Sequence, residues 1–316
     1  MPLGTWHRIH HHPGLLSFSM SSSVRPPTLD PIAVSHWKRR AAAASPWLHE
    51  EIAQRMMDRL TWITLQPKTW IHWCAVRGGL QAHAALAKRF PDSTCFALEL
   101  EGKQASVAAE KIAKPWWSPK RFQMARTRFE RPESGTADML WANMSLHESA
   151  DPAHLLASWH AALKVNGFVM FSCLGPDTAR ELHEVYALMG WPVAGADMTD
   201  MHDWGDMLVR TGFAEPVMDM ERITLTYETP GRLLEELREL GRNVHPARFQ
   251  GLRGRGWQTK VEAAMAQHLP RDQEGRLILT FEVIYGHAFK AAPKVKVSAL
   301  SAVSVSDMRS MLRQPR

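Results

Sequence analysis

The chain has 316 residues, of which 45% are hydrophobic and 22% are charged, an ordinary globular balance that allows one large α/β domain. No apolar run approaches the ~18–20 residues that a membrane-spanning helix needs, so the sequence excludes such a helix and predicts a soluble protein. The formal net charge of +6 permits nucleic acid, anionic lipid or an acidic protein as a partner and does not choose among them.

Both ends of the chain lack the patterns of folded structure. Residues 1–31 are rich in Ser, Pro and His without periodicity, and the apolar run Leu15–Phe18 is too short for the ~7–15-residue core of a signal peptide. Residues 291–316 show neither a helix stop nor an apolar face. We therefore expect disordered tails around a folded domain over residues 32–290.

Residues 68–220 alternate apolar strands with helices, after an amphipathic helix at 46–65 in which apolar residues recur every three to four positions. The patterns predict strands at 70–73, 93–101, 137–146, 168–175 and 216–220, and helices at 80–90, 103–114, 151–167, 176–190 and 200–213. This alternation predicts an open, doubly wound, mostly parallel sheet.

The pattern changes after residue 220. Residues 221–229 alternate by twos and residues 276–290 form a long β run, so two antiparallel strands are expected at the edge of the sheet. Between them, residues 231–240 predict an amphipathic helix and residues 242–257 a basic, glycine-rich loop. We expect residues 228–275 to form an insertion on the substrate side.

The turn after the first strand, at Gly78 and Gly79, is where a doubly wound sheet binds ligands. Glycines there let a ligand approach the backbone, and an acid after the second strand can accept hydrogen bonds from two ribose hydroxyls. Glu99 stands 20 residues beyond Gly79, with Glu101 as the alternative on the same strand face. A plain α/β crossover with a Gly-Gly turn would show the same features.

Residues 140–186 carry the most specific motifs. Trp141-Ala142-Asn143 lies in the second half of the strand predicted at 137–146, and FSCLGPDTARELHEVY runs off the next strand. These motifs resemble class I S-adenosylmethionine-dependent methyltransferases and are most similar to the malonyl-acyl carrier protein O-methyltransferases of biotin synthesis. The resemblance covers roughly residues 30–290, including the ending TFEVIYGHAFK. It implies a seven-stranded Rossmann-like fold, an S-adenosylmethionine cofactor and a malonyl-carrying acyl carrier protein as substrate.

The family's glycine pattern, acid-x-Gly-x-Gly-x-Gly, is altered in this chain. His72 stands at the acid, Cys74 and Val76 stand at the first two glycines, and Gly78 keeps its identity. A Cβ matters at these positions if the backbone needs a positive φ, and Arg77 would repel a sulfonium unless it points outward. The resemblance implies that the cofactor is bound by His72, Cys74, Gly78, Gly79, Glu99 and Asn143.

On the substrate side, His147, His183 and Tyr186 are the candidates, because the first follows Asn143 closely and the other two lie one turn apart on a predicted helix. No general base is expected, since a malonyl carboxylate is already an anion at neutral pH. Asp177 and Thr178 have the residue types of helix caps, and ligand contact is the alternative.

A basic stretch with interleaved aromatic residues lies late in the chain. An acyl carrier protein is acidic, so this stretch could steer it; RNA phosphates or plain solvent are the alternatives. No recognised RNA-binding motif is present, so nucleic acid is not expected as a partner. The patch proposed for the carrier protein comprises Arg242, Arg248, Arg253, Arg255 and Lys260.

Three cysteines, Cys74, Cys95 and Cys173, lack the spacing of a metal site and indicate buried, reduced thiols in a cytoplasmic protein without a bound metal. Three interpretations of function stay open. The chain is an active methyltransferase with an altered pocket, a scaffold or carrier-protein binder of the same fold that has lost the cofactor, or a methyltransferase for another small molecule or RNA.

Overall fold

The computed structural model describes residues 29–113 and 124–292, and within them seven strands form a single sheet. The strands are β1 (Thr69–Trp73), β2 (Thr94–Leu98), β3 (Arg126–Arg128), β4 (Ala137–Ala142), β5 (Leu163–Leu174), β6 (Phe213–Tyr227) and β7 (Leu277–Lys290). Their order is β3-β2-β1-β4-β5-β7-β6, and β7 runs antiparallel to both of its neighbours while the other pairs are parallel. The predicted doubly wound, mostly parallel seven-stranded sheet is confirmed.

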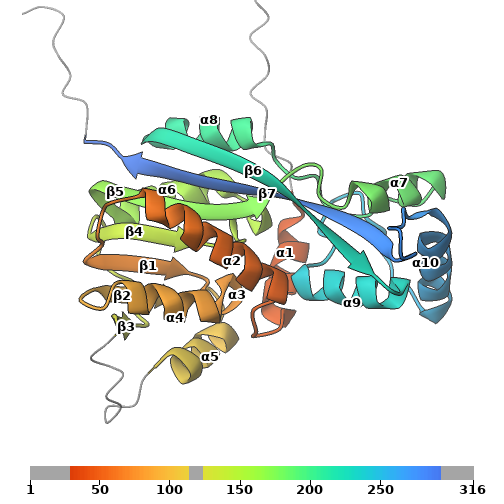
Figure 1. Ribbon diagram of the computed structural model, residues 1–316, viewed down its shortest axis with the longest axis horizontal. Coiled ribbons are helices and arrows are strands. Elements are labelled where there is room, and N and C mark those ends of the chain that lie inside the picture. The colour runs from red at the N-terminus through yellow and green to blue at the C-terminus, as the bar shows by residue number, and fades with distance from the viewer. Residues whose placement is uncertain (1–28, 114–123, 293–316) are drawn as a thin grey trace, which may run out of the picture.

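Helices cover both faces of the sheet (Figure 1). In the described residues they are α1 (Pro31–Arg40), α2 (Trp47–Arg59), α3 (Ala75–Gly78), α4 (Leu80–Arg89), α5 (Gly102–Ile112), α6 (Pro152–Ala162), α7 (Arg180–Leu188), α8 (Met201–Thr211), α9 (Pro230–Leu240) and α10 (Arg255–His268), with short 3₁₀ turns η1 (Leu60–Trp62) and η3 (Leu146–Glu148). α2 and α4 pack on one face, whereas α6 and α8 pack on the other.

Strand alternation sorts the core into two layers. Along β1, Trp70 joins the cluster under α2 and α4, while Ile71 joins the cluster over α6 and α8. Trp141 and Leu140 divide in the same way on β4. Because the central strands are buried on both faces, the carboxyl ends of β1 and β4 are held side by side, which fixes the turns that follow them.

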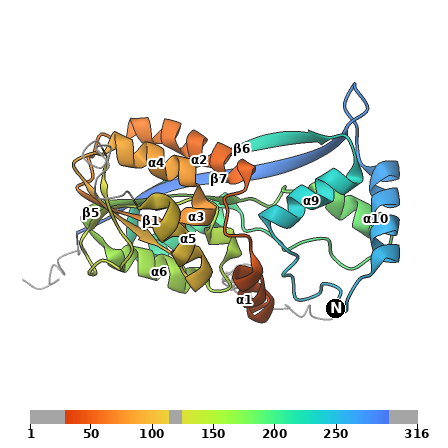
Figure 2. The ribbon, with the colours of Figure 1, turned by 90° about the horizontal axis from the view of Figure 1, so that it is seen from below.

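The long strands β6 and β7 extend past the sheet and carry a separate group of helices at their far end (Figure 1). We call α7, α9, α10 and the loop 241–254 the helical lobe. α1 lies between the sheet and the lobe (Figure 2). It is joined to the lobe by an ion pair between Asp30 and Arg248 at 2.8 Å, and to α5 by a hydrogen bond from Gln104 to the Lys38 carbonyl at 3.4 Å.

Several predicted boundaries are wrong. The helix predicted to end at residue 167 ends at Ala162, because the chain enters β5, where Asn166 has a positive φ and Gly167 lies against the β4 backbone. β6 is one continuous strand, and Pro216, which has no N–H, lies at its irregularity. The fold also begins before residue 32, since Asp30 caps α1. The other residues of the two predicted tails lie mostly outside the described ranges.

The sequence did not predict α10. Its glycine-rich start at Gly254 and Gly256 and its weak apolar spacing resemble a loop. The helix forms because Val261, Ala264 and Met265 pack into the core that the lobe shares with the sheet.

Candidate active site

The turn after β1 has a residue with positive φ at Cys74, the position of the family pattern's first glycine. Cys74 adopts a left-handed conformation with φ 53°, and the backbone N–H of Gly78 donates to its carbonyl at 2.7 Å. A non-glycine residue there stores about 1–3 kcal/mol of strain. The Val76 side chain is fully buried in a small cluster with Ala97 and Ala108, so its Cβ does not enter the cavity that follows.

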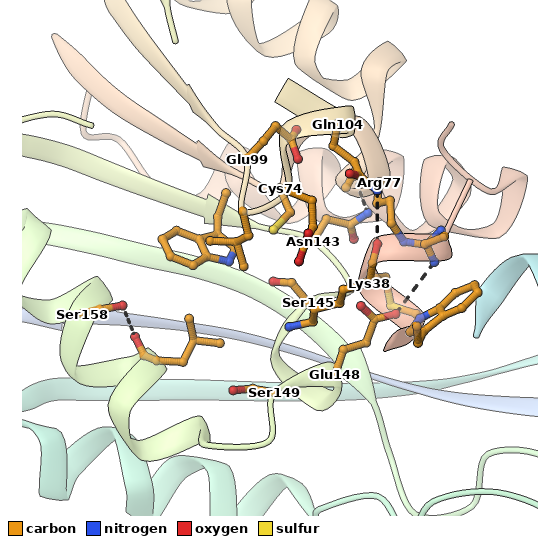
Figure 3. A pocket seen from close by; sticks show the side chains of 18 of the residues that line it. Lys38, Cys74, Arg77, Glu99, Gln104, Asn143, Ser145, Glu148, Ser149 and Ser158 are labelled. Atoms are coloured by element: carbon orange, nitrogen blue, oxygen red, sulfur yellow. Dashed lines mark hydrogen bonds and ion pairs between the residues drawn. The ribbon is translucent and has the colours of Figure 1, made fainter. Parts of the chain in front are cut away.

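That cavity has a volume of about 340 Å³ and is surrounded by the ends of β1, β2 and β4 together with α1 (Figure 3). We call it the first cavity. Three residues that line it each have a polar atom that is buried without a hydrogen-bond partner among the described residues: Arg77 Nη1, Gln104 Oε1 and Ser145 Oγ. Unpaired buried polar atoms are costly, so the wall suits a polar ligand that pairs with them.

Glu99 lies directly after β2 and faces the first cavity. Its Oε1 accepts the backbone N–H of Val76 at 2.7 Å, which ties the end of β2 to the turn. Burial raises the pKa of Glu99 to about 7, although the Val76 hydrogen bond opposes this shift. Glu101 also borders the cavity, so both predicted acids are brought to the same place.

Asn143 lines the first cavity, but its amide is used by the protein. The two N–H bonds of Nδ2 donate to the His49 and Gly78 carbonyls at 2.8 and 2.6 Å, and Oδ1 accepts from the Ser172 hydroxyl at 2.6 Å. Asn143 therefore fastens α2, the turn and β5 together. Its amide supports the shape of the cavity and has no free donor for the cofactor.

Trp73 and Arg77 frame the first cavity and leave it open. Trp73 is 6% exposed and packs edge-to-face on Trp159. The Arg77 guanidinium turns toward the lobe, where Nη2 donates to the Leu240 carbonyl at 2.9 Å, and it lies 5.3 Å from the centre of the Trp37 ring. The Arg77 guanidinium therefore points outward, as is required if it is not to repel a sulfonium.

Two residues expected at the cofactor lie elsewhere. His72 is fully buried beneath the turn, where its Nδ1 is 3.1 Å from Nδ1 of His83, and it does not line the cavity. Gly79 has φ 124°, and a Cβ there would lie 2.9 Å from Glu50, whose carboxylate accepts the N–H groups of Gln81 and Ala82 in the first turn of α4. Gly79 therefore allows the turn its positive φ, and His72 packs beneath the turn.

A larger cavity of about 930 Å³ lies between the sheet and the helical lobe. We call it the second cavity. The three predicted substrate-side residues, His147, His183 and Tyr186, all line it. Much of the remaining wall is apolar, and four arginines border it: Arg238, Arg242, Arg253 and Arg255.

The predicted basic patch is only partly assembled. Arg242, Arg253 and Arg255 line the second cavity, and the Arg253 guanidinium lies 3.7 Å from the centre of the Trp257 ring. Arg248 does not line it, because its side chain pairs with Asp30. Lys260 is exposed on α10, away from the cavity. The five basic residues are close in sequence, but only three of them lie together at the second cavity.

Asp177 and Thr178 do not cap α7, whose N-cap is Ala179 with φ 54°. The Asp177 backbone N–H donates to the buried carboxylate of Glu282 at 2.9 Å, and the Thr178 hydroxyl donates to the Glu282 carbonyl at 3.1 Å. The prediction that Asp177 and Thr178 cap this helix is therefore wrong. The turn is fastened to β7, and Thr178 and Ala179 line the second cavity.

The two cavities share three wall residues, Trp37, Met144 and Glu148. Sequence reasoning missed Trp37 and Glu148, together with Lys38 at the first cavity and His49 at the second. Trp37, Lys38 and His49 precede the sheet and carry no motif, so only the packing of α1 and α2 over the strand ends reveals them.

Within the described residues, no helix is long and apolar enough to span a membrane, and no group of His, Cys, Asp or Glu has the geometry of a metal site.

The fold and the similarity to known proteins together define the class of protein. A methyltransferase domain family matches residues 76–171, which include the turn, Glu99 and Asn143. The crystal structure of a protein from Bacillus halodurans C-125 described as a methyltransferase aligns with a TM-score of 0.50 at 12% identity, covering 77% of this chain and 100% of that one. At this identity the likeness shows the fold alone, which is that of the methyltransferases.

Closer relatives give the particular family. The chain is 34% identical over 271 residues to the malonyl-[acyl-carrier protein] O-methyltransferase of Gallionella capsiferriformans, covering 83% of this chain and 91% of the relative. It is 35% identical over 255 residues to the protein of the same name from Laribacter hongkongensis, covering 78% and 84%. The chain belongs to the malonyl-[acyl-carrier protein] O-methyltransferase family.

Proposed function

We propose that this methyltransferase esterifies the free carboxylate of a malonyl group carried by an acyl carrier protein, with S-adenosylmethionine as the methyl donor, in the synthesis of a biotin precursor. The observation that carries the proposal is the meeting of two cavities at Trp37, Met144 and Glu148. One has the turn and the acid that a nucleoside cofactor needs. The other is larger and largely apolar, with arginines at its border.

The first cavity fits S-adenosylmethionine. One carboxylate oxygen of Glu99 accepts the Val76 N–H, and the other is available to accept ribose hydroxyls. Gln104 Oε1 and Ser145 Oγ lack partners among the described residues and could pair with the ligand's polar groups. When bound, the cofactor supplies a methyl group on a sulfonium, and a carboxylate acceptor needs no general base. The chain's own contribution is alignment and exclusion of water.

The second cavity suits an extended thioester arm on an acidic carrier. Its apolar wall, which includes Leu182, Trp257 and Phe281, can cover an alkyl and amide chain. Arg253 and Arg255 lie at this cavity, where they can steer an acidic partner by long-range attraction. Cys74, Cys95 and Cys173 are free thiols, which agrees with the proposed cytoplasmic location.

The test combines binding and transfer. The purified protein is titrated with S-adenosylmethionine in a calorimeter and then incubated with labelled cofactor and malonyl-, acetyl- or holo-carrier protein. We expect heat of binding and label on the malonyl form alone. Absence of both heat and label would support a scaffold without cofactor, and label on RNA in a parallel incubation would support an RNA methyltransferase. Either result overturns the proposal.

A further inference from the structure

Two histidines border the second cavity where it meets the first. His147 belongs to η3 and directly precedes Glu148, a wall residue of both cavities. His49 belongs to α2, and its carbonyl accepts the Asn143 side chain at 2.8 Å. Both rings are therefore within reach of a substrate that extends from the second cavity toward a methyl donor in the first.

The surrounding backbone fixes which nitrogen of each ring carries a proton. Nδ1 of His147 lies 3.3 Å from the Leu174 backbone nitrogen, whose N–H donates to it, so a neutral His147 carries its proton on Nε2. Nδ1 of His49 lies 2.9 Å from the Arg77 carbonyl, which can only accept, so the proton of His49 is on Nδ1 and its Nε2 is a lone pair. His147 is therefore a donor toward the cavity and His49 an acceptor.

Both rings are neutral at pH 7, because their pKa values lie well below it. Burial lowers the pKa of His147 to about 4, with Arg77 and Lys38 acting in the same direction and Glu148 opposing them. Burial likewise lowers the pKa of His49 to about 3, assisted by Arg77 and His147. Among the described residues, the hydrogen bond of the His147 ring is made by Nδ1, which leaves Nε2 unpaired, and the residue lines the second cavity.

We infer that the Nε2–H of His147 binds one oxygen of the substrate's free carboxylate and leaves the other oxygen to receive the methyl group. The inference rests on the proposed function and names the residue that selects the carboxylate. A neutral donor orients the carboxylate without cancelling the negative charge that attacks. The lone pair of His49 repels a carboxylate and thereby confines it to the His147 side.

Two amide substitutions separate this role from a structural one. In His147→Asn, the side-chain oxygen can still accept the Leu174 N–H, but no donor reaches the cavity. In His147→Gln, the distal amide reaches the position of Nε2 and restores the donor. The readouts are KM for malonyl-carrier protein, inhibition by acetyl-carrier protein, which lacks the carboxylate, and calorimetric affinity for S-adenosylmethionine.

We expect His147→Asn to raise KM for the malonyl form by roughly 10- to 100-fold, since a hydrogen bond to a charged group is lost. Inhibition by the acetyl form and affinity for the cofactor stay unchanged, and His147→Gln stays within a few-fold of the wild type. Equal KM in wild type and His147→Asn, or equal losses for both substrate forms, would overturn the inference while wild-type methylation still upholds the function. A wild type that transfers no methyl group to malonyl-carrier protein would overturn both.

Discussion

The two cavities are built in different ways. The first is formed at the ends of adjacent parallel strands, and its shape depends on backbone positions such as Cys74 with its positive φ and on the carboxylate of Glu99. The second lies between sheet and helical lobe, and its chemistry depends on side chains from segments far apart in sequence, such as His147 and Arg255. A backbone-built site tolerates changes of residue type as long as the turn keeps its conformation.

This contrast explains how the glycine pattern could change without closing the site. Val76 directs its side chain into a buried cluster, and its backbone N–H still binds Glu99. The acid of the family pattern is replaced by His72, which packs beneath the turn. The chemistry of the second cavity depends on side chains such as His147 and Arg255, so each can be tested singly.

The largest effect is expected at the acid of the first cavity. Glu99→Ala removes the oxygen that accepts ribose hydroxyls and also frees the Val76 N–H. We expect S-adenosylmethionine affinity to fall by roughly 10- to 100-fold, measured by calorimetry. Glu101→Ala is the matched control, because Glu101 borders the same cavity without a side-chain cap on α5, and its effect should be several-fold smaller. Equal losses in both variants would contradict the assignment of Glu99.

The next effect concerns the backbone of the turn. Gly79→Ala places a Cβ at φ 124° and within 2.9 Å of Glu50. We expect the free energy of unfolding to fall by about 1–3 kcal/mol in denaturant titrations. Gly102→Ala is the control, since its Cβ would meet nothing within 4 Å and its φ is not positive, so stability should be unchanged or slightly higher. Unchanged stability in Gly79→Ala would contradict the claim that the turn requires glycine at this position.

A smaller effect is expected at the border of the second cavity. Arg255→Glu reverses a charge at that cavity, whereas Lys260→Glu makes the same change in net charge outside it. We expect association with malonyl-carrier protein to slow by several-fold in the first variant at low salt, with the difference shrinking as ionic strength rises. Stopped-flow measurement of the association rate tests this. Equal slowing in both variants would indicate non-specific attraction.

The last prediction is a pH dependence of stability from Glu99. Its pKa is about 7 in the folded protein, above the ordinary value of 4.5. Below pH 4.5 both states are protonated; between 4.5 and 7 the unfolded chain releases the proton first, so Glu99 increasingly favours unfolding as pH rises, up to a constant penalty above 7. The Tm of Glu99→Gln should therefore match the wild type at pH 4.5 and exceed it at pH 8. If the difference in Tm between Glu99→Gln and the wild type did not change with pH, the raised pKa of the buried Glu99 carboxylate would be contradicted.

Much of the first cavity could be predicted from sequence. Strand periodicity placed the sheet and put Gly78 and Glu99 at neighbouring strand ends, and the family resemblance added Asn143. What could not be predicted was how each is used. The amide of Asn143 is satisfied by the His49 and Gly78 carbonyls and Ser172, and these partners come from elements that no local pattern connects.

The second cavity was harder to predict because it depends on tertiary packing. Arg248 and Arg255 are equivalent in a linear count of charge, yet one is held by Asp30 and the other lines the cavity. α10 was missed because its stability comes from burial of Val261 and Met265. Trp37 shows the same limit, since its place between the cavities follows from how α1 packs.

The most direct test is a crystal structure of the protein with S-adenosylhomocysteine. If the altered turn still forms a cofactor site, the ribose hydroxyls will lie within hydrogen-bond distance of Glu99, and the sulfur will face the boundary formed by Trp37 and Met144. Ligand bound outside the first cavity, or a cavity filled by the Arg77 guanidinium or the Trp73 ring in crystals soaked to saturation, would contradict the account.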